Sequence, residues 1–491
     1  MSANERAPVG IPGLDIILGG GLPRDRIYLV EGDPGVGKST LALQFLMTGV
    51  AAGERSLYIT LSETEAEVRQ IADSHGWSLD GLSMFELSAL EQQMQLDAEN
   101  TVFRPSEVEL TETTRAILAF VERVQPRRVV FDSLSELRLL SQGALRYRRE
   151  VLNLKQYFTK NRATVLLLDD RTSETGDMQL QSLAHGVISL QQLPPEFGDD
   201  RRRLRVAKLR GAPFRSGYHD FEIVKGGLEV FPRLIASEHR TEFDRTSLSS
   251  GVAELDSLLG GGLARGTSTI LMGPAGTGKS SIAALYASAA ADRGDKVAMF
   301  VFDEQRELLI QRSDALGMKM TKHVAAGTIL IRQIDPAQMS PGQLGCLAQQ
   351  LVESDGAKVI VIDSLNGYLE AMPAERHLYI QLHELLSYFG QCGATTVLVM
   401  AQNGIVGTMQ SPIDVSYIAD AVVLLRYFEA AGRIRKAISV IKKRVGIHEN
   451  TIREIVFDQR GITVGPALAE FRGVLTTVPE YYGTRDNLDP S

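Results

Sequence analysis

Two stretches of this sequence have the residue types and the spacing of a loop that binds phosphate. Both fit the pattern G-x-x-x-x-G-K-[ST], and one further hydroxyl residue follows each. In such loops the glycines let the backbone turn tightly, so that successive N–H groups point at phosphate oxygens. The lysine reaches the β- and γ-phosphates, and the hydroxyl after it ligates Mg²⁺. The residues are Gly32, Asp33, Pro34, Gly35, Val36, Gly37, Lys38, Ser39 and Thr40, and then Gly273, Pro274, Ala275, Gly276, Thr277, Gly278, Lys279, Ser280 and Ser281.

The sequence around each loop supports this interpretation. Apolar, β-rich segments precede the loops at Arg26–Val30 and Thr267–Met272, and a helical pattern follows each loop. A helix that begins at the loop adds the positive end of its dipole to the phosphate site. The sequence therefore predicts two sites for a nucleoside triphosphate, with ATP and Mg²⁺ as cofactors and Ser39 and Ser280 as metal ligands.

An aspartate ends a buried, valine-rich segment behind each loop. Asp132 closes the first such segment, and Asp363 closes the second. A carboxylate at the carboxyl end of a strand beside the phosphate loop holds Mg²⁺, often through water. The alternative is that each aspartate only caps the next turn. The paired loops favour the metal role.

A second acidic position follows the strand that we expect after the helix of each loop. It is Glu63, preceded by Ser62, in the first half, and the adjacent Asp303 and Glu304 in the second half. Attack on a γ-phosphate needs a carboxylate that orients the nucleophile and accepts its proton. We therefore expect Glu63 and Glu304 to be catalytic, with Asp303 as a further candidate. The alternative role is to start a helix, where Ser, Asp and Glu are favoured, and we expect a helix over Glu63–His75.

Two pairs of basic residues share one internal spacing, Lys208 with Arg210 and Lys442 with Arg444. On a strand, residues two apart lie on one face, so both charges of a pair can point at one ligand. The pairs lie far along the chain from the loops, which suits cations supplied to a neighbouring subunit's nucleotide. An ordinary solvated strand face is the alternative, and we assign no function to the basic segment Arg201–Arg205.

Composition narrows the class of protein. The chain has 491 residues, of which 44% are hydrophobic and 23% charged, as in an ordinary globular protein of two or more domains. The net charge of −8 argues against a broadly basic surface for nucleic acid. We see no membrane-spanning segment or signal peptide and expect a cytoplasmic protein. Cys346 and Cys392 are interpreted as thiols.

The chain reads as one unit used twice. The segment before the first loop, Gly10–Pro23, matches the segment Gly251–Ala264 before the second. We place the boundary in the polar stretch Ser237–Ser247, giving domains 1–240 and 241–491. Strands alternate with helices in each, which predicts an α/β fold with a mainly parallel sheet flanked by helices. Strand-like segments at the end of each domain, Arg203–Lys208 and Phe221–Val230 in the first, predict an antiparallel edge.

With these parts assembled, the chain resembles the double-domain KaiC family of RecA-like P-loop ATPases. The resemblance covers roughly Pro8 to Gly465, in both halves. It is carried, beyond the phosphate loops, by Gly20–Pro23, Leu41–Phe45, Ser74–Leu79, Lys208–Gly211, Ile418–Tyr427 and Thr451–Glu454.

The resemblance implies two tandem RecA-like domains that assemble into a two-tiered hexamer with ATP at the subunit interfaces. It also implies slow ATP hydrolysis in the N-terminal ring and serine/threonine autokinase activity in the C-terminal ring. The catalytic pair of the family is Glu-Glu, so Ser62 and Asp303 depart from it at the first position. The family's acceptor pair, Ser then Thr, falls on Ser416 and Tyr417, which makes Ser416 the expected phospho-acceptor.

Three hypotheses for the function remain open at this point. The first is an oligomeric ATPase and autokinase whose phosphorylation state signals to a KaiB-like or other partner. The second is a nucleotide-gated protein-binding platform with residual hydrolysis. The third is a RecA-like DNA motor, which the acidic composition and the lack of a basic–aromatic stripe disfavour.

Overall fold

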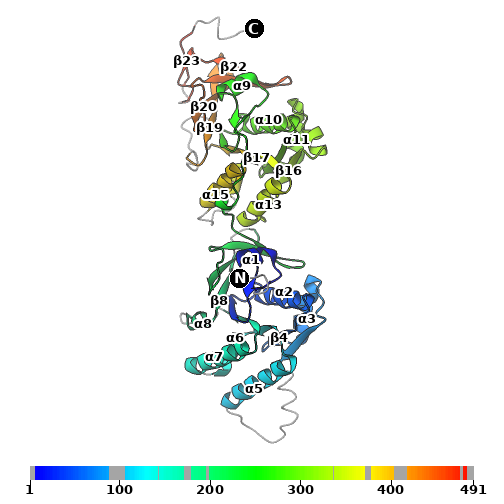
Figure 1. Cartoon of the computed structure of the whole chain (residues 1–491). Coiled ribbons are helices and arrows are strands. Elements are labelled where there is room, and N and C mark those ends of the chain that lie inside the picture. The colour runs from blue at the N-terminus through cyan, green and yellow to red at the C-terminus, as the bar shows by residue number, and fades with distance from the viewer. Residues whose placement is uncertain are drawn as a thin grey trace. The chain divides into compact units, whose positions relative to one another are not determined.

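The computed structural model describes residues 6–87, 106–141, 143–170, 178–194, 198–335, 337–370, 378–402, 417–475 and 479–483. The chain divides into two compact units, Met1–Arg233 and Leu234–Ser491 (Figure 1). No helix among these residues is long and apolar enough to cross a membrane. The polar segment 91–105, whose sequence has no clear period and predicts a loop or an insertion, lies outside the described residues.

The first unit is built on a nine-stranded sheet in the order β11-β10-β9-β8-β3-β7-β6-β4-β5. Strands β8, β3, β7, β6, β4 and β5 pair in parallel, while β9, β10 and β11 form an antiparallel edge. The strands are β3 (Ile27–Gly32), β4 (Ser56–Thr60), β5 (Leu82–Glu86), β6 (Arg128–Asp132), β7 (Thr164–Asp170), β8 (Gly186–Leu193), β9 (Arg201–Leu209), β10 (His219–Val224) and β11 (Gly227–Phe231).

All but one of the described helices of the first unit lie in the connections between its parallel strands. They are α2 (Lys38–Ala51), α3 (Glu65–His75), α5 (Ser106–Val124), α6 (Leu134–Ser141), α7 (Ala144–Lys160) and α8 (Met178–Leu183). The remaining helix, α1 (Pro12–Ile17), lies between two short strands, β1 (Arg6–Ala7) and β2 (Leu22–Pro23), which pair antiparallel.

The second unit repeats this sheet, in the order β16-β15-β17-β18-β14-β19-β20-β21-β22, again parallel at one side and antiparallel at the other. Its strands are β14 (Ser268–Gly273), β15 (Lys296–Val301), β16 (Ile329–Gln333), β17 (Ala357–Asp363), β18 (Thr395–Ala401), β19 (Ala421–Ala430), β20 (Arg433–Lys443), β21 (Arg453–Asp458) and β22 (Gly461–Ala467). Strand for strand, the order is the same as in the first unit, which bears out the predicted repeat.

The remaining elements of the second unit follow the same plan. Its helices are η2 (Ala236–Glu238), α9 (Ala253–Leu258), α10 (Lys279–Asp292), α11 (Arg306–Ala315), α12 (Met320–Ala325), α13 (Pro341–Glu353), α14 (Leu365–Glu370) and α15 (Leu378–Gln391). Two small antiparallel pairs join β12 (Ser247–Leu248) to β13 (Leu263–Ala264), and β23 (Phe471–Arg472) to β24 (Glu480–Tyr481).

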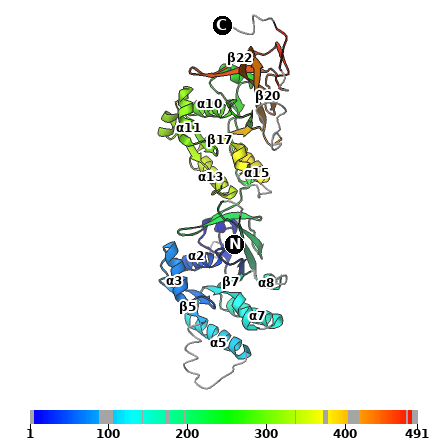
Figure 2. The same cartoon turned by 180° about the vertical axis from the view of Figure 1, so that it is seen from behind.

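Each sheet is buried on both faces, because its central strands carry apolar residues at nearly every position. On β7, Leu166 and Leu168 face the core formed with α2 and α3, and Val165 and Leu167 face the core formed with α5, α6 and α7. In the second unit α10 and α11 cover one core, and α13 and α15 cover the other (Figures 1 and 2). The parallel α/β prediction is therefore confirmed.

Two sequence predictions need correction in detail. The helix predicted from Glu63 begins at Glu65, because Thr64 caps it and forms a reciprocal capping box with Glu67. The single strand-like segment predicted at Phe221–Val230 is two strands, β10 and β11. Gly226 and Gly227 have φ angles of 106° and 115° and turn the chain between them.

Candidate functional site

The first phosphate loop lies between the carboxyl end of β3 and the start of α2. Gly37 has a φ of 106° and is the last residue before the helix, a conformation that needs glycine. The buried Lys38 Nζ donates to the carbonyls of Gly32 and Asp33, both at 2.9 Å. It also forms an ion pair with Asp170 at 2.7 Å. The lysine is therefore held along the loop, where a phosphate chain would lie.

Strand pairing explains the Asp170 contact. Strands β3 and β7 are neighbours, and their register pairs Gly32 with Asp170. In the second unit the same pairing, between β14 and β18, puts Ala401 opposite Gly273. The second loop lysine therefore lacks the carboxylate that the first one has at this place.

The predicted metal ligands of the first unit meet. Ser39 Oγ donates to Asp132 Oδ2 at 3.0 Å, and the buried hydroxyl of Tyr58 donates to the same oxygen at 2.5 Å. Burial raises the pKa of Asp132, while the hydrogen bonds from Tyr58 and Ser39 lower it. A serine hydroxyl and a carboxylate at the start of the loop's helix are oxygen donors of the kind that suit Mg²⁺.

Glu63 lies close to these groups, as expected of a general base. Its Oε2 is buried and has no hydrogen-bond partner among the residues that the structure describes. Burial raises the pKa of Glu63, and the negative charges of Asp132, Glu67 and Asp170 raise it further. The Thr60 hydroxyl fixes the backbone of Glu63, accepting from its N–H at 3.0 Å and donating to its carbonyl at 2.7 Å. The carboxylate is thus held by its backbone, and its proton affinity is high.

The second unit repeats the loop and the contact between a serine and an aspartate. Lys279 Nζ donates to the carbonyl of Pro274 at 2.6 Å, and burial lowers the pKa of Lys279 to about 8. Burial raises the pKa of Asp363, and a hydrogen bond from Ser280 opposes this shift. The resulting pKa is about 6. Serine and aspartate are therefore in contact here as well, at the same place relative to the lysine.

A cavity of about 500 Å³ opens over the second loop. Its walls are Gly276, Gly278, Lys279, Ser280, Ser281, Glu304, Arg312, Ala315, Leu316, Lys436 and Phe457. Volumes of this size hold small-molecule ligands. Its charged groups come from Lys279, Glu304, Arg312 and Lys436, and Leu316 and Phe457 supply apolar surface, with Lys436 Nζ 4.8 Å from the centre of the Phe457 ring. The cavity therefore offers both cations for a polyphosphate and apolar surface for a ring.

The predicted acids of the second unit separate in the structure. Glu304 lines the cavity and forms a two-point ion pair with Arg312, at 2.7 and 3.2 Å. Asp303 instead accepts a hydrogen bond from the Ser364 hydroxyl. Glu304 is thus the better placed of the two for chemistry on a ligand in the cavity.

Both basic pairs bond backbone carbonyls within their own unit. Lys208 Nζ donates to the carbonyls of Gln181 and Ala184, at 2.6 and 2.8 Å, and Arg210 donates to Ser182 at 3.1 Å. These bonds hold the segment that leads from α8 into β8. The trans role of the first pair stays a prediction.

The second pair holds the matching segment before β19. Lys442 Nζ donates to the carbonyl of Ala419 at 2.8 Å, and Arg444 donates to Tyr417 at 2.7 Å. Arg444 also lies 3.5 Å from Asp420. The recurrence in both units shows that these cations have a structural function, and their trans role also stays a prediction.

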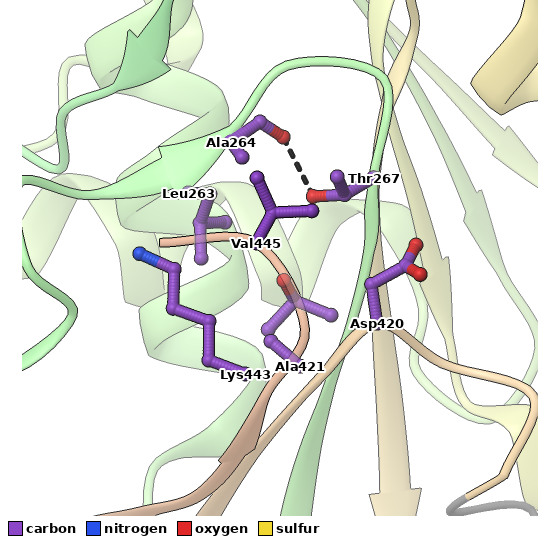
Figure 3. Close-up of a pocket in the computed structure, with 8 residues that line it drawn as sticks. Leu263, Ala264, Thr267, Asp420, Ala421, Lys443 and Val445 are labelled. Carbon is purple, nitrogen blue, oxygen red and sulfur yellow. Dashed lines mark hydrogen bonds between the residues drawn. The ribbon is translucent and has the colours of Figure 1, made fainter. Parts of the chain in front are cut away.

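Asp420 also lines a small cavity, and Lys443, which follows Lys442 in the chain, is another of its lining residues (Figure 3). Lys443 Nζ donates to the carbonyls of Leu259 and Gly262, and the Thr267 hydroxyl donates to Ala264 at 2.6 Å. The volume is about 10 Å³, which accommodates a single water at most. This cavity is not a ligand site.

Ser416 lies outside the described residues, so the acceptor prediction stays a prediction. Three residues at the sites escaped the sequence reasoning. Asp170 could have been found, since it ends an apolar strand as Asp132 does. Tyr58 and Arg312 are a tyrosine within a strand and an arginine within a helix, and no local pattern marks them.

Comparison with known proteins adds to this geometry. The family model for the KaiC ATPase matches residues 7–235 and 248–469. The circadian clock protein KaiC3 of Synechocystis sp. is 24% identical, over 97% of this chain and 95% of its own length. The circadian clock oscillator protein KaiC of Thermostichus vulcanus is 27% identical, over 97% of this chain and 92% of its own length. Each unit thus carries one matched range with its phosphate loop, and the two sheets are tandem RecA-like domains.

Proposed function

The chain belongs to the KaiC family of ATPases, and from that premise we propose that both units bind and hydrolyse ATP with Mg²⁺ and that the C-terminal unit phosphorylates Ser416. The observation that carries the proposal is one arrangement present twice: a buried lysine along the loop, a serine in contact with an aspartate, and a glutamate nearby.

Each group has a defined part in hydrolysis. Lys38 and Lys279 neutralise the phosphate chain, and the loop N–H groups orient it. Ser39 with Asp132, and Ser280 with Asp363, would hold Mg²⁺, which would supply positive charge against the charge that develops on the leaving phosphate. Glu63, with its raised pKa and unbonded carboxylate oxygen, orients a water and accepts its proton.

In the C-terminal unit the nucleophile of the proposed kinase reaction is a serine hydroxyl. Ser416 Oγ attacks the γ-phosphorus, the bond from that phosphorus to the β–γ bridging oxygen breaks, and ADP leaves. The hydroxyl proton goes to Glu304, which lines the cavity over the loop. The support for Ser416 is its match to the acceptor position of the family.

We also propose a homo-oligomeric ring in which Lys208 with Arg210, and Lys442 with Arg444, complete a neighbouring subunit's site. A KaiB-like or other signalling protein would read the phosphorylation state of such a ring. Two relatives are named circadian clock proteins, which supports a signalling role.

Intact-mass spectrometry after incubation with ATP and Mg²⁺, alongside ATP turnover, tests the proposal. Wild type should gain the mass of one phosphate per chain, and Ser416→Ala and Glu304→Gln should not. Lys38→Ala and Lys279→Ala should each halve the bound nucleotide. Nucleotide binding without turnover or mass gain would favour the binding platform instead. ATPase activity that DNA stimulates would favour the motor.

A further inference from the structure

Arg312 lines the cavity over the second phosphate loop. The reaction proposed above assigns no role to this cation. It lies near the end of α11, which runs beside α10 (Figure 1). One edge of its guanidinium binds both oxygens of Glu304, at 2.7 and 3.2 Å. Its Nη1 donates to Ser281 Oγ at 2.8 Å. The guanidinium therefore spans the cavity wall from the phosphate loop to the proposed base.

The position of Ser281 defines what this guanidinium faces. Ser281 follows the metal-binding Ser280 at the first turn of α10, and both residues line the cavity together with Arg312. Helix N-termini and loop N–H groups at this place bind phosphate. A guanidinium binds phosphate with the same two-point geometry that it uses for a carboxylate. Arg312 is thus within reach of a phosphate that sits at the start of α10.

The first unit has no counterpart to this cation. Glu63 and Glu304 occupy matching positions, and the residue that matches Arg312 on α3 is Ile71. Ile71 packs against the apolar core of its unit. The base Glu63 accordingly has an unbonded carboxylate oxygen, whereas Glu304 has a guanidinium partner. The feature belongs to the C-terminal unit alone.

We propose that Arg312 binds nucleotide phosphate in the C-terminal unit and that Glu304 and the phosphate compete for its guanidinium. A phosphate carries more charge than one carboxylate, so a bound nucleotide draws Arg312 from Glu304. Nucleotide binding then releases the Glu304 carboxylate to accept a proton. The inference rests on the proposed function, since it requires nucleotide in this cavity.

A double-mutant cycle on nucleotide affinity tests the competition. All variants are made in full-length Lys38→Ala protein, in which the first site no longer binds nucleotide and binding at the second site is measured. Mg²⁺–ADP is titrated into this protein and its affinity is measured by calorimetry. Arg312→Ile, which copies the first unit, should weaken ADP binding about ten- to hundredfold, the range for losing charge-assisted hydrogen bonds. Glu304→Gln should tighten it several-fold, because it removes the competing charge. With Arg312→Ile already present, Glu304→Gln should have no effect.

The controls separate failure of this inference from failure of the proposed function. Arg306→Gln, on the same helix and 3.7 Å from Glu307, should leave ADP affinity unchanged. Arg312→Lys keeps the positive charge but loses the two-point geometry of the guanidinium, so its ADP affinity should lie between that of the parent protein and that of Arg312→Ile. If ADP binds but Arg312→Ile leaves its affinity intact, or Glu304→Gln weakens binding, the competition is refuted. If the Lys38→Ala protein binds no nucleotide, the proposed function of this unit fails and the inference fails with it.

Discussion

Tyr58 is predicted to hold the metal-binding carboxylate of the first unit, and Tyr58→Phe tests this. Its buried hydroxyl donates to Asp132 Oδ2 at 2.5 Å, beside the 3.0 Å bond from Ser39. Met299 occupies the matching place on β15, since Thr60 pairs with Asp132 as Val301 pairs with Asp363. The second unit therefore lacks this donor, and the perturbation is specific to the first.

The expected magnitude follows from the hydrogen bond. A bond to a charged group contributes about 1.5–3 kcal/mol, and phenylalanine recovers part of that because it buries no hydroxyl. We expect a net loss of about 1.4 kcal/mol in the interaction of Asp132 with Mg²⁺, which is roughly tenfold in the Mg²⁺ midpoint. The bond also lowers the pKa of Asp132, so its loss raises that pKa. As the pH is lowered, Mg²⁺ binding by Tyr58→Phe should then be lost at a higher pH than in the parent protein.

The assay is Mg²⁺-dependent nucleotide binding to full-length Lys279→Ala protein, in which the first site alone is intact. Tyr28→Phe is the matched control, because the Tyr28 hydroxyl is also buried and also donates at 2.5 Å, but to the carbonyl of Pro23. Tyr28→Phe should lower stability without moving the Mg²⁺ midpoint. An unchanged midpoint in Tyr58→Phe, or an equal shift in both variants, would refute the reasoning.

Three further predictions follow from other parts of the structure. Nucleotide binding by the second unit, measured against pH in Lys38→Ala protein, should rise through about pH 6 as Asp363 ionises and fall through about pH 8 as Lys279 loses its proton; a flat profile between pH 5 and 9 would contradict this. Mixing Arg210→Ala with Glu63→Gln subunits, both also carrying Lys279→Ala, should partly restore ATP hydrolysis, whereas no rescue would exclude sites completed in trans. Arg128→Met should lower the free energy of unfolding of the first unit, measured in urea, by about 3–5 kcal/mol, because the buried Arg128 side chain, 1% exposed, binds one carboxylate and two carbonyls. A decrease below about 1 kcal/mol would contradict this, because it would show that the carboxylate and the carbonyls form other hydrogen bonds in the variant.

Much of the fold was readable from the sequence, because local patterns decide it. Segments such as Thr164–Leu168 are apolar at nearly every position, which is typical of strands covered on both faces. The repeat of Gly10–Pro23 at Gly251–Ala264 predicted two units of one topology, and the two strand orders agree. The incorrect predictions concern the ends of elements and the turns between them. Thr64, for example, caps a helix, so that helix begins at Glu65 and not at Glu63 as predicted.

The candidate site was readable only in part. The loops and the strand-end acids follow from spacing along the chain, so Ser39 and Asp132 could be named together and are in contact. The adjacent Asp303 and Glu304 were grouped because they are neighbours in sequence. The structure separates them, since successive side chains diverge and Ser364 binds the first while Arg312 binds the second.

By itself the sequence determined the parts that depend on short-range spacing, namely two phosphate loops, two pairs of a serine and an aspartate, and a duplicated parallel α/β unit. Tertiary structure decided how the two sites differ. Register between β3 and β7 places Asp170 against Lys38, whereas the same register in the second unit places Ala401 beside its loop. Packing of α11 against α10 likewise brings Arg312 to Ser281. These contacts join residues far apart in the chain, so their distances depend on strand pairing and helix packing, which local spacing does not contain.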